Sequence, residues 1–275
     1  MQYAQFQQHA SLLACPLCRA PLRVVGGQAL LCKKKHCFDI ARQGYVNLIP
    51  NKSAAYPPEL FAHRRRIYGD GFYAPFAQRL DAVLDSFCSA ETPVLLDAGC
   101  GEGYYARTLR AHAPCVKLAF DISKDAVLLA ARQGKEALWM VAELDNIPVR
   151  SGAADVVLNI LTPAHYAEFA RVLRPGGLVV KVVPGSDYLA ELRALAGPQL
   201  RNQTYDNAEV LAYFEAHVRL LHKERVAYTL SVAPEQALAW AGMTPLLMGV
   251  DIGQLRLDAL TAITIDLDIF VGERK

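Results

Sequence analysis

Short apolar runs alternate with helical segments through the middle of this chain, and this alternation limits its possible folds more than any other feature. We expect strands at 94–96, 116–120, 138–142, 154–161 and 178–183, and helices at 104–112, 125–132 and 165–173. Strands and helices at this spacing form a parallel sheet that helices cover on both faces. Two strand-like segments, 218–231 and 263–271, should complete the sheet as antiparallel strands. We therefore predict an α/β fold.

The first 50 residues differ from the rest. They hold four of the seven cysteines and short β-prone pieces around a turn signal at Gly26-Gly27. Adjacent prolines in the segment 51–58 block a helix and favour an extended linker. From residue 59 to 89 the apolar spacing is helical, with an interruption at 69–71. The expected organisation is a small module at 1–50, a linker and helical segment at 51–92, and the main domain at 93–275.

The cysteine pattern of the small module is typical of a metal site. Cys15 and Cys18 form a Cys-x-x-Cys pair, and Cys32 and His36 follow after 13 intervening residues, which suffice for a short hairpin. Four protein ligands leave no open coordination position, so we expect a structural Zn²⁺ rather than a catalytic one. Cys37 is an alternative to His36 as the fourth ligand. A redox Cys-x-x-Cys is disfavoured because no βαβ unit precedes it.

Composition bounds the cellular setting and the partners. A 53% hydrophobic and 20% charged composition describes a globular protein with a sizeable core. No apolar run approaches the roughly 18 residues of a membrane-spanning helix, and no secretion signal is visible, so we expect a cytoplasmic protein without a membrane partner. The net charge of +2 does not itself indicate nucleic-acid binding, but Lys33–Lys35 and Arg64–Arg66 are local basic clusters that can contact phosphates.

A glycine-rich turn follows the first strand of the main domain. Asp97 ends the strand, and the turn contains Gly99, Gly101, Glu102, Gly103 and Tyr104. Glycine turns of this kind bring backbone close to a ligand, but dinucleotide-binding folds use them too. A carboxylate at this position would repel a pyrophosphate and attract the ammonium group of a methionine moiety. The pattern therefore favours a cationic nucleoside over a dinucleotide.

Three later strand ends supply further candidate contacts. Asp121 suits a bidentate contact with ribose hydroxyls, and Ile122 can pack on an adenine face. Glu143, followed by Leu144, lies where an acceptor can meet the adenine amino group, and Asn159 would line the methyl-transfer side. Each acid taken singly has an alternative role as a surface carboxylate or a helix cap.

These residues together resemble the class I methyltransferases, which have a Rossmann-like domain and use S-adenosyl-L-methionine. A later segment, 171–177, reads Arg-Val-Leu-Arg-Pro-Gly-Gly ahead of a strand and strengthens the likeness. The expected fold class is thus a Rossmann-like class I methyltransferase domain with a small N-terminal zinc-binding β module.

Across both parts the chain resembles the bacterial 23S ribosomal RNA guanine-N1 methyltransferases. The motifs that carry this likeness are Cys15–Cys18, Cys32–His36, Phe38-Asp39, Gly44–Pro50, Arg64-Arg65 and Asp97–Tyr105. The resemblance implies zinc at Cys15, Cys18, Cys32 and His36, and methylation of N1 of a guanine in a 23S rRNA hairpin loop. It also implies that Tyr73 and Tyr188 lie near the cofactor, although relatives tend to carry histidine at the position of Tyr188. The oligomeric state stays open, with a homodimer among the alternatives.

The expected reaction needs alignment of the acceptor with an activated methyl group and the loss of the proton on guanine N1. The sequence does not identify the base, and His165 is as readily an ordinary helix-start residue. No Asn/Asp-Pro-Pro-Tyr motif for exocyclic amines occurs, which favours a ring nitrogen as the acceptor. Two alternatives are a methyltransferase that acts on a small molecule and a non-catalytic zinc-containing RNA-binding protein.

Overall fold

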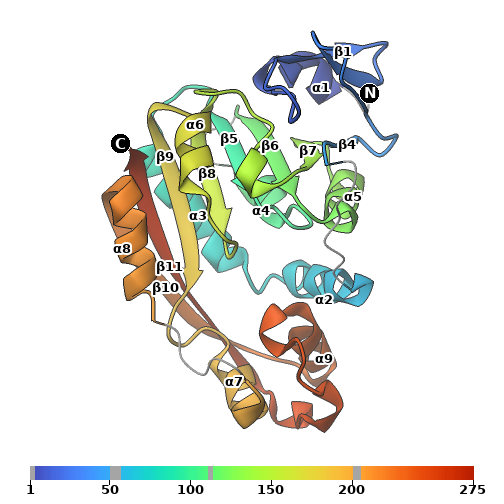
Figure 1. Cartoon of the computed structure of the whole chain (residues 1–275). Coiled ribbons are helices and arrows are strands. Elements are labelled where there is room, and N and C mark those ends of the chain that lie inside the picture. Colours follow the sequence, from blue (N-terminus) through green and yellow to red (C-terminus); the bar gives the residue numbers. More distant parts are fainter. Residues whose placement is uncertain (1–3, 50–56, 111–113, 201–205) are drawn as a thin grey trace.

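An eight-stranded sheet in the order β10–β11–β9–β8–β5–β6–β7–β4 forms the centre of the protein (Figure 1). The structure is a computed structural model that describes residues 4–49, 57–110, 114–200 and 206–275. The strands are β4 (Tyr45–Asn47), β5 (Val94–Ala98), β6 (Val116–Asp121), β7 (Ala137–Val141), β8 (Ala154–Ile160), β9 (Leu173–Pro184), β10 (Val218–Ser231) and β11 (Ala262–Arg274). From β4 to β9 neighbouring strands are parallel, whereas β11 is antiparallel to β9 and β10. The predicted α/β fold is confirmed.

Two element boundaries differ from the predicted ones by several residues. β9 begins at Leu173 rather than at 178, because Leu173 pairs with Ala154 before a register shift. The helix expected at 104–112 is shorter, since α4 (Tyr104–Thr108) ends where the backbone becomes extended at Leu109. Most of the linker expected at 51–58 lies outside the described residues, as do residues 111–113.

Helices cover both faces of the sheet. Phe76 of α3 (Ala74–Phe87), Leu192 of α7 (Ala190–Ala196) and Trp240 of α9 (Pro234–Met243) belong to one buried apolar cluster. Phe169 of α6 (Tyr166–Val172) and Phe214 of α8 (Ala208–His217) belong to the cluster on the opposite face. Two further helices, α2 (Pro58–Gly69) and α5 (Lys124–Gln133), contact α9 and β7 respectively. No helix in the described ranges is long and apolar enough to cross a membrane.

The N-terminal module packs against the edge of the main domain that carries β7 (Figure 1). It contains α1 (Ala4–His9) and a three-stranded antiparallel sheet of β1 (Leu22–Val25), β2 (Ala29–Cys32) and β3 (Cys37–Asp39). Its next strand, β4, leaves this small sheet and pairs in parallel with β7, so that Tyr45 lies beside Trp139. Residues 45–47 therefore belong to the large sheet, although the sequence placed them in the separate module.

Candidate functional site

A cavity of about 930 Å³ lies at the carboxyl ends of the parallel strands. Its walls come from the loops after β5, β6, β7 and β8, from the end of β9, and from α2 and the segment after α9. Parallel sheets bind ligands at this edge because the loops that follow neighbouring strands converge there. The residues expected to bind a cofactor that line the cavity are Tyr73, Asp97, Gly99, Gly101, Glu102, Tyr104, Asp121, Ile122, Glu143, Leu144 and Tyr188.

The three glycines of the β5–α4 turn share one backbone conformation, but Gly101 and Gly103 have different roles. All have left-handed backbone conformations, with φ of +80°, +54° and +77° at Gly99, Gly101 and Gly103. A Cβ at Gly103 would lie 2.5 Å from the Trp139 ring, and this glycine does not line the cavity. A Cβ at Gly101 would meet nothing closer than Arg64 Nη1 at 3.9 Å. Gly103 therefore permits packing, whereas Gly101 leaves space for a ligand.

Asp97 has a buried carboxylate with one oxygen that lacks a hydrogen-bond partner within the described ranges. Its residue is 2% exposed, and Oδ2 has no hydrogen-bond partner among the described residues. Burial raises the pKa of Asp97 to about 7, and the nearby charge of Asp121 adds to the shift. A buried acceptor without a partner is destabilising, so a cationic donor in the cavity would supply the missing interaction. The unpartnered carboxylate oxygen fits the ammonium group of a methionine moiety, which would donate to it.

Asp121 fixes the glycine turn and still faces the cavity. Its Oδ2 accepts a hydrogen bond from the Gly101 N–H at 2.8 Å, and its Oδ1 accepts one from the Ser123 N–H at 2.8 Å. Each carboxylate oxygen has a second lone pair, so both can also accept from a pair of hydroxyl groups. Beside it, the Ile122 side chain is 37% exposed, and Glu143 and Leu144 line the same wall. This side of the cavity suits a nucleoside.

Asn159 does not line the cavity, contrary to its expected place at the methyl-transfer side. It is 0% exposed; its Nδ2 donates to the Pro163 carbonyl at 2.8 Å, and its Oδ1 accepts from Lys181 Nζ at 2.6 Å. Lys181 Nζ also donates to the Thr162 carbonyl at 2.7 Å. The amide is therefore directed into the turn that follows its own strand. Ile160, Thr162 and Lys181 form the cavity wall there.

Two tyrosines far apart in the sequence meet in the cavity wall. The hydroxyls of Tyr73 and Tyr188 lie 2.7 Å apart in a hydrogen bond, and burial raises the pKa of Tyr73 well above its usual value. Tyr68 packs edge-on against Tyr73 and stacks on Tyr104 with ring centroids 4.2 Å apart. This cluster closes the side of the cavity that α2 and α4 share.

The module's metal-ligating side chains converge on one point. One ligand atom from each of Cys15, Cys18, Cys32 and His36 lies within 4.8 Å of the others. The sulfurs of Cys18 and Cys32 are 3.7 Å apart, and two thiolates on one tetrahedral zinc ion stand about 3.8 Å apart. The donor set therefore fits zinc. Cys37 is exposed on β3 and lies outside the group.

Comparison with known proteins connects the two parts. Residues 13–54 match the family model described as RlmA, N-terminal, a zinc ribbon, and residues 96–181 match the methyltransferase domain model. The Streptomyces fradiae 23S rRNA (guanine(748)-N(1))-methyltransferase is 38% identical over 79% of this chain and 79% of its own length. YxjB of Bacillus subtilis (strain 168), named provisionally as a 23S rRNA (guanine-N(1)-)-methyltransferase, is 34% identical over 95% of this chain and 97% of its own length.

The chain belongs to the 23S rRNA (guanine-N1) methyltransferase family. The methyltransferase domain and the zinc ribbon expected from the sequence are thereby confirmed, and the protein is an enzyme that uses S-adenosyl-L-methionine. A solved structure, YcgJ of Bacillus subtilis, covers 72% of this chain and 99% of its own with a TM-score of 0.52 and 14% identity. That likeness establishes the fold of the methyltransferase part only.

Sequence reasoning misplaced Arg64. Its Nε donates to the Met243 carbonyl at 3.1 Å, and its Nη1 lies 3.9 Å from Glu102 Oε2 in the cavity. The predicted phosphate-binding run is thus divided, because of its three arginines only Arg65 and Arg66 are exposed. The signal that could have separated Arg64 is helical spacing, since it lies one turn before the cavity residue Tyr68. Lys181 carried a partial signal: a lysine within the apolar strand predicted at 178–183 indicates a buried partner, but the sequence does not show which turn it reaches.

His165 lies in the cavity wall as the N-cap of α6. Its Nδ1 accepts a hydrogen bond from the Glu168 N–H at 3.2 Å. With Nδ1 occupied as an acceptor, the neutral imidazole carries its proton on Nε2. In this arrangement His165 offers the cavity a hydrogen-bond donor and not a base.

Proposed function

We propose that this enzyme methylates N1 of a guanine in a hairpin loop of 23S rRNA, with S-adenosyl-L-methionine as the methyl donor. The observation that carries the proposal is similarity to such enzymes along 95% of the chain, through both the zinc ribbon and the methyltransferase domain. The name of the Streptomyces fradiae relative specifies guanine 748, so this nucleotide is the first to test.

The cofactor would be held by the residues that converge at the carboxyl edge of the sheet. Asp97 would accept from the ammonium group and Asp121 from the ribose hydroxyls, while Ile122 and Leu144 would pack on the adenine and Glu143 would accept from its amino group. Tyr73, Gly99, Gly101, Glu102, Tyr104 and Tyr188 would complete the contacts. The bound cofactor supplies a methyl group already activated by its sulfonium, so the chain's residues mainly orient the acceptor.

The acceptor side needs to favour loss of the N1 proton. Lys181 holds the turn after β8, and burial lowers the pKa of Lys181 to about 8, so it is largely an ammonium ion at neutral pH. We infer that this charge favours the anion that guanine forms when N1 releases its proton to solvent. His165 could donate from Nε2 to the same base.

The zinc ribbon would contribute structure and RNA contacts. We propose Cys15, Cys18, Cys32 and His36 as the ligands of one structural zinc ion, and Lys33–Lys35 with Arg65 and Arg66 as contacts for phosphates. All five basic residues are exposed. A homodimer stays a prediction, which a mass of twice 30.2 kDa in sedimentation equilibrium would establish.

Primer extension on treated RNA tests the proposal. Purified protein is incubated with isotope-labelled cofactor and unmodified 23S rRNA, and reverse transcriptase should then stop beside one guanine, because an N1 methyl group blocks Watson–Crick pairing. Transfer of label to small metabolites alone would support a small-molecule methyltransferase. RNA binding without transfer would support a non-catalytic RNA-binding protein.

A further inference from the structure

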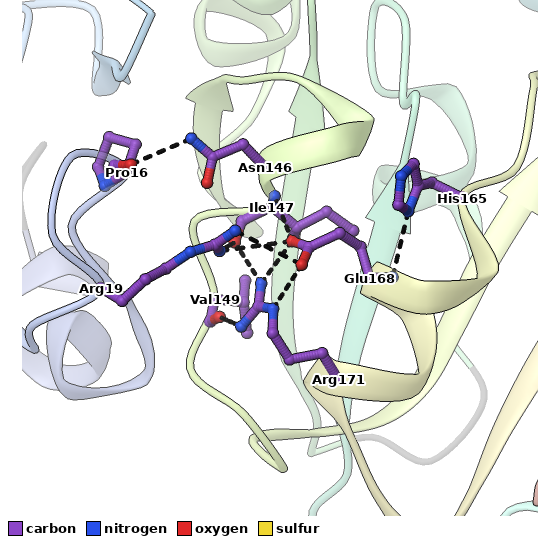
Figure 2. Close-up of polar contacts among 8 residues, drawn as sticks. All are labelled: Pro16, Arg19, Asn146, Ile147, Val149, His165, Glu168 and Arg171. Carbon is purple, nitrogen blue, oxygen red and sulfur yellow. Dashed lines mark hydrogen bonds and ion pairs between the residues drawn. The ribbon is translucent and has the colours of Figure 1, made fainter.

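The zinc turn is hydrogen-bonded to the wall of the cofactor cavity (Figure 2). Arg19, the residue after the ligand Cys18, reaches out of the module and donates from Nη1 to the Ile147 carbonyl at 3.1 Å. From the other side, Asn146 Nδ2 donates to the Pro16 carbonyl at 3.1 Å. Residues 146 and 147 directly follow the cavity-lining residues 143–145. Two hydrogen bonds therefore join the turn that carries two metal ligands to the segment on the nucleoside side of the cavity.

Glu168 lies at the centre of these contacts. Its Oε2 accepts from the Ile147 N–H at 2.8 Å and from Arg19 Nη1 at 3.4 Å, and its two oxygens also accept from Arg171 at 2.7 Å each. Arg171 in turn donates to the carbonyls of Ile147 and Val149 at 2.7 Å each. Burial acts to raise the pKa of Glu168, but hydrogen bonds and the charge of Arg171 outweigh it and hold the pKa below its usual value.

Both cavity walls depend on Glu168. On one side its carboxylate fixes the segment after Glu143, and on the other its backbone N–H donates to His165 in the turn after β8 (Figure 2). Arg171 and Glu168 are both on α6, whereas Arg19 is the member of the cluster that comes from the zinc module. A change in the zinc turn can thus reach the cavity through the Arg19 side chain, beside the Asn146–Pro16 hydrogen bond and the backbone hydrogen bond from Ala14 to Pro148.

The position of Arg19 depends on the metal-binding turn. Its backbone is left-handed, with φ of +59°, and its N–H donates to the Cys15 carbonyl at 2.7 Å. A residue with a Cβ adopts this conformation only when its surroundings impose it. Two thiolates of the same turn converge on the metal site, so zinc would hold the turn closed and Arg19 in place.

We propose that Arg19 is a positioning residue that couples the zinc site to the cofactor pocket. The inference rests on the proposed function, since it needs both zinc and S-adenosyl-L-methionine to bind where we place them. Coupling between two sites is reciprocal: zinc strengthens cofactor binding by the same factor by which cofactor strengthens zinc binding. Because Arg19 is partly exposed, we expect a factor on the order of tenfold, at the lower end of typical couplings.

Arg19→Met in the full chain, together with a matched control, tests the coupling. The control is Arg174→Met, because Arg174 pairs with Asp155 at nearly the same side-chain exposure, 42% and 14%, as Arg19 with Glu168, 43% and 10%. Arg174 contacts neither the zinc turn nor residues 146–149 in the described structure. Calorimetry gives the affinity for S-adenosylhomocysteine, and equilibrium competition with a chromogenic chelator gives the affinity for zinc with and without that ligand.

In the wild type and in Arg174→Met, S-adenosylhomocysteine should raise the affinity for zinc. In Arg19→Met, one zinc per chain should remain, affinity for S-adenosylhomocysteine should fall roughly tenfold, and the ligand should raise zinc affinity by a smaller factor than in the wild type. Arg19→Lys should recover part of both effects, because it keeps the charge but not the forked geometry.

Two outcomes would overturn the coupling. One is an Arg19→Met variant with unchanged affinity for S-adenosylhomocysteine and an unchanged effect of that ligand on zinc affinity; the other is a wild type in which the ligand does not change zinc affinity. The second measurement needs no variant, so it decides even if Arg19→Met does not fold. A wild type that holds zinc but binds no S-adenosylhomocysteine would instead overturn the proposed function.

Discussion

At the scale of single residues, Asp97 shows how burial adjusts a carboxylate for a cationic ligand. Moved out of water, its charged form loses solvation, and its pKa rises to about 7 from the usual 3.8. A cation bound nearby would restore the charged form and lower the pKa again. Cofactor affinity should therefore depend on pH in the physiological range.

We predict that cofactor binding strengthens on the order of tenfold between pH 6 and pH 8 and that Asp97→Asn removes this dependence. The folded pKa is above the unfolded one, so the carboxyl stabilises the unliganded protein at low pH and this contribution is lost as pH rises through 7. Ligand affinity changes in the opposite direction, because the ionised form attracts the cation. Calorimetry with S-adenosylhomocysteine at both pH values measures the effect; a flat wild-type profile would contradict it.

Two glycines of one turn should respond differently to the same substitution. Gly103→Ala places a Cβ against the Trp139 ring. We therefore predict that the free energy of unfolding falls by several kcal/mol, because of overpacking and backbone strain. A Cβ at Gly101 would meet only Arg64 Nη1, at an ordinary contact distance of 3.9 Å. The free energy of unfolding of Gly101→Ala should therefore fall by about 1–2 kcal/mol from backbone conformation alone. Gly101→Ala should nevertheless weaken cofactor binding at least tenfold. Equal melting temperatures for the two variants would show that Trp139 does not determine the role of Gly103.

At the scale of secondary-structure elements, local patterns predicted β5 to β9 and the helices between them well. A fully buried parallel strand is a short apolar run, and its helix has the complementary periodicity, so both are visible locally. The pairing of β4 with β7 was not visible, because three residues near position 46 contact a strand more than 90 residues away. Local sequence carries no information about such a partner.

The same limit applied to the site. Asp97 and Asp121 could be found because each ends a strand beside a recognisable turn, and strand ends share one edge of a sheet. Helical spacing could have set Arg64 apart from Arg65 and Arg66, but it could not show the contact with Met243. The contact of Lys181 with Thr162 was likewise hidden, because the chain brings these residues near only when folded. Asn159 was correctly placed at the end of its strand, but its amide direction was not predictable.

Zinc removal should affect the ribbon selectively. The buried apolar residues of the module, such as Leu22 and Leu30, share one cluster with the face of the large sheet rather than forming a separate core. The turns that carry the ligands should therefore still depend on metal binding for much of their folding free energy. We predict that a chelator abolishes hydrogen-exchange protection in β1, β2 and β3, while β5, β6 and β8 keep theirs. Hydrogen-exchange mass spectrometry reads both groups in one experiment. Unchanged protection in β2 after verified zinc loss would contradict a metal-dependent module.

At the scale of the whole molecule, charge is locally concentrated and globally small. The net charge is only +2, so RNA affinity must come from clusters such as Lys33–Lys35 rather than from a general field. These lysines are exposed on the turn between β2 and β3. Contacts with phosphates release counterions, which makes their contribution measurable through salt dependence.

We predict that changing all three lysines to alanine weakens RNA binding and makes the negative slope of log affinity against log salt shallower. The slope should change by about 2, because each lost phosphate contact contributes about 0.7. Cofactor affinity should not change. Lys223→Ala is the control, because this exposed lysine lies on β10 at the opposite edge of the sheet from β4. A slope identical to the wild type would exclude this cluster from the RNA contact surface.

The contribution of residues 45–47 to the large sheet affects how such enzymes can be divided and recombined. A fragment that starts at residue 93 would leave β7 as an outermost strand with unpaired backbone N–H and C=O groups, which attract strands from neighbouring molecules. A chimera that exchanges N-terminal modules between relatives would preserve the catalytic fold only if its junction lies before Tyr45. The edge strand β4 and its partner β7 would then come from the same protein.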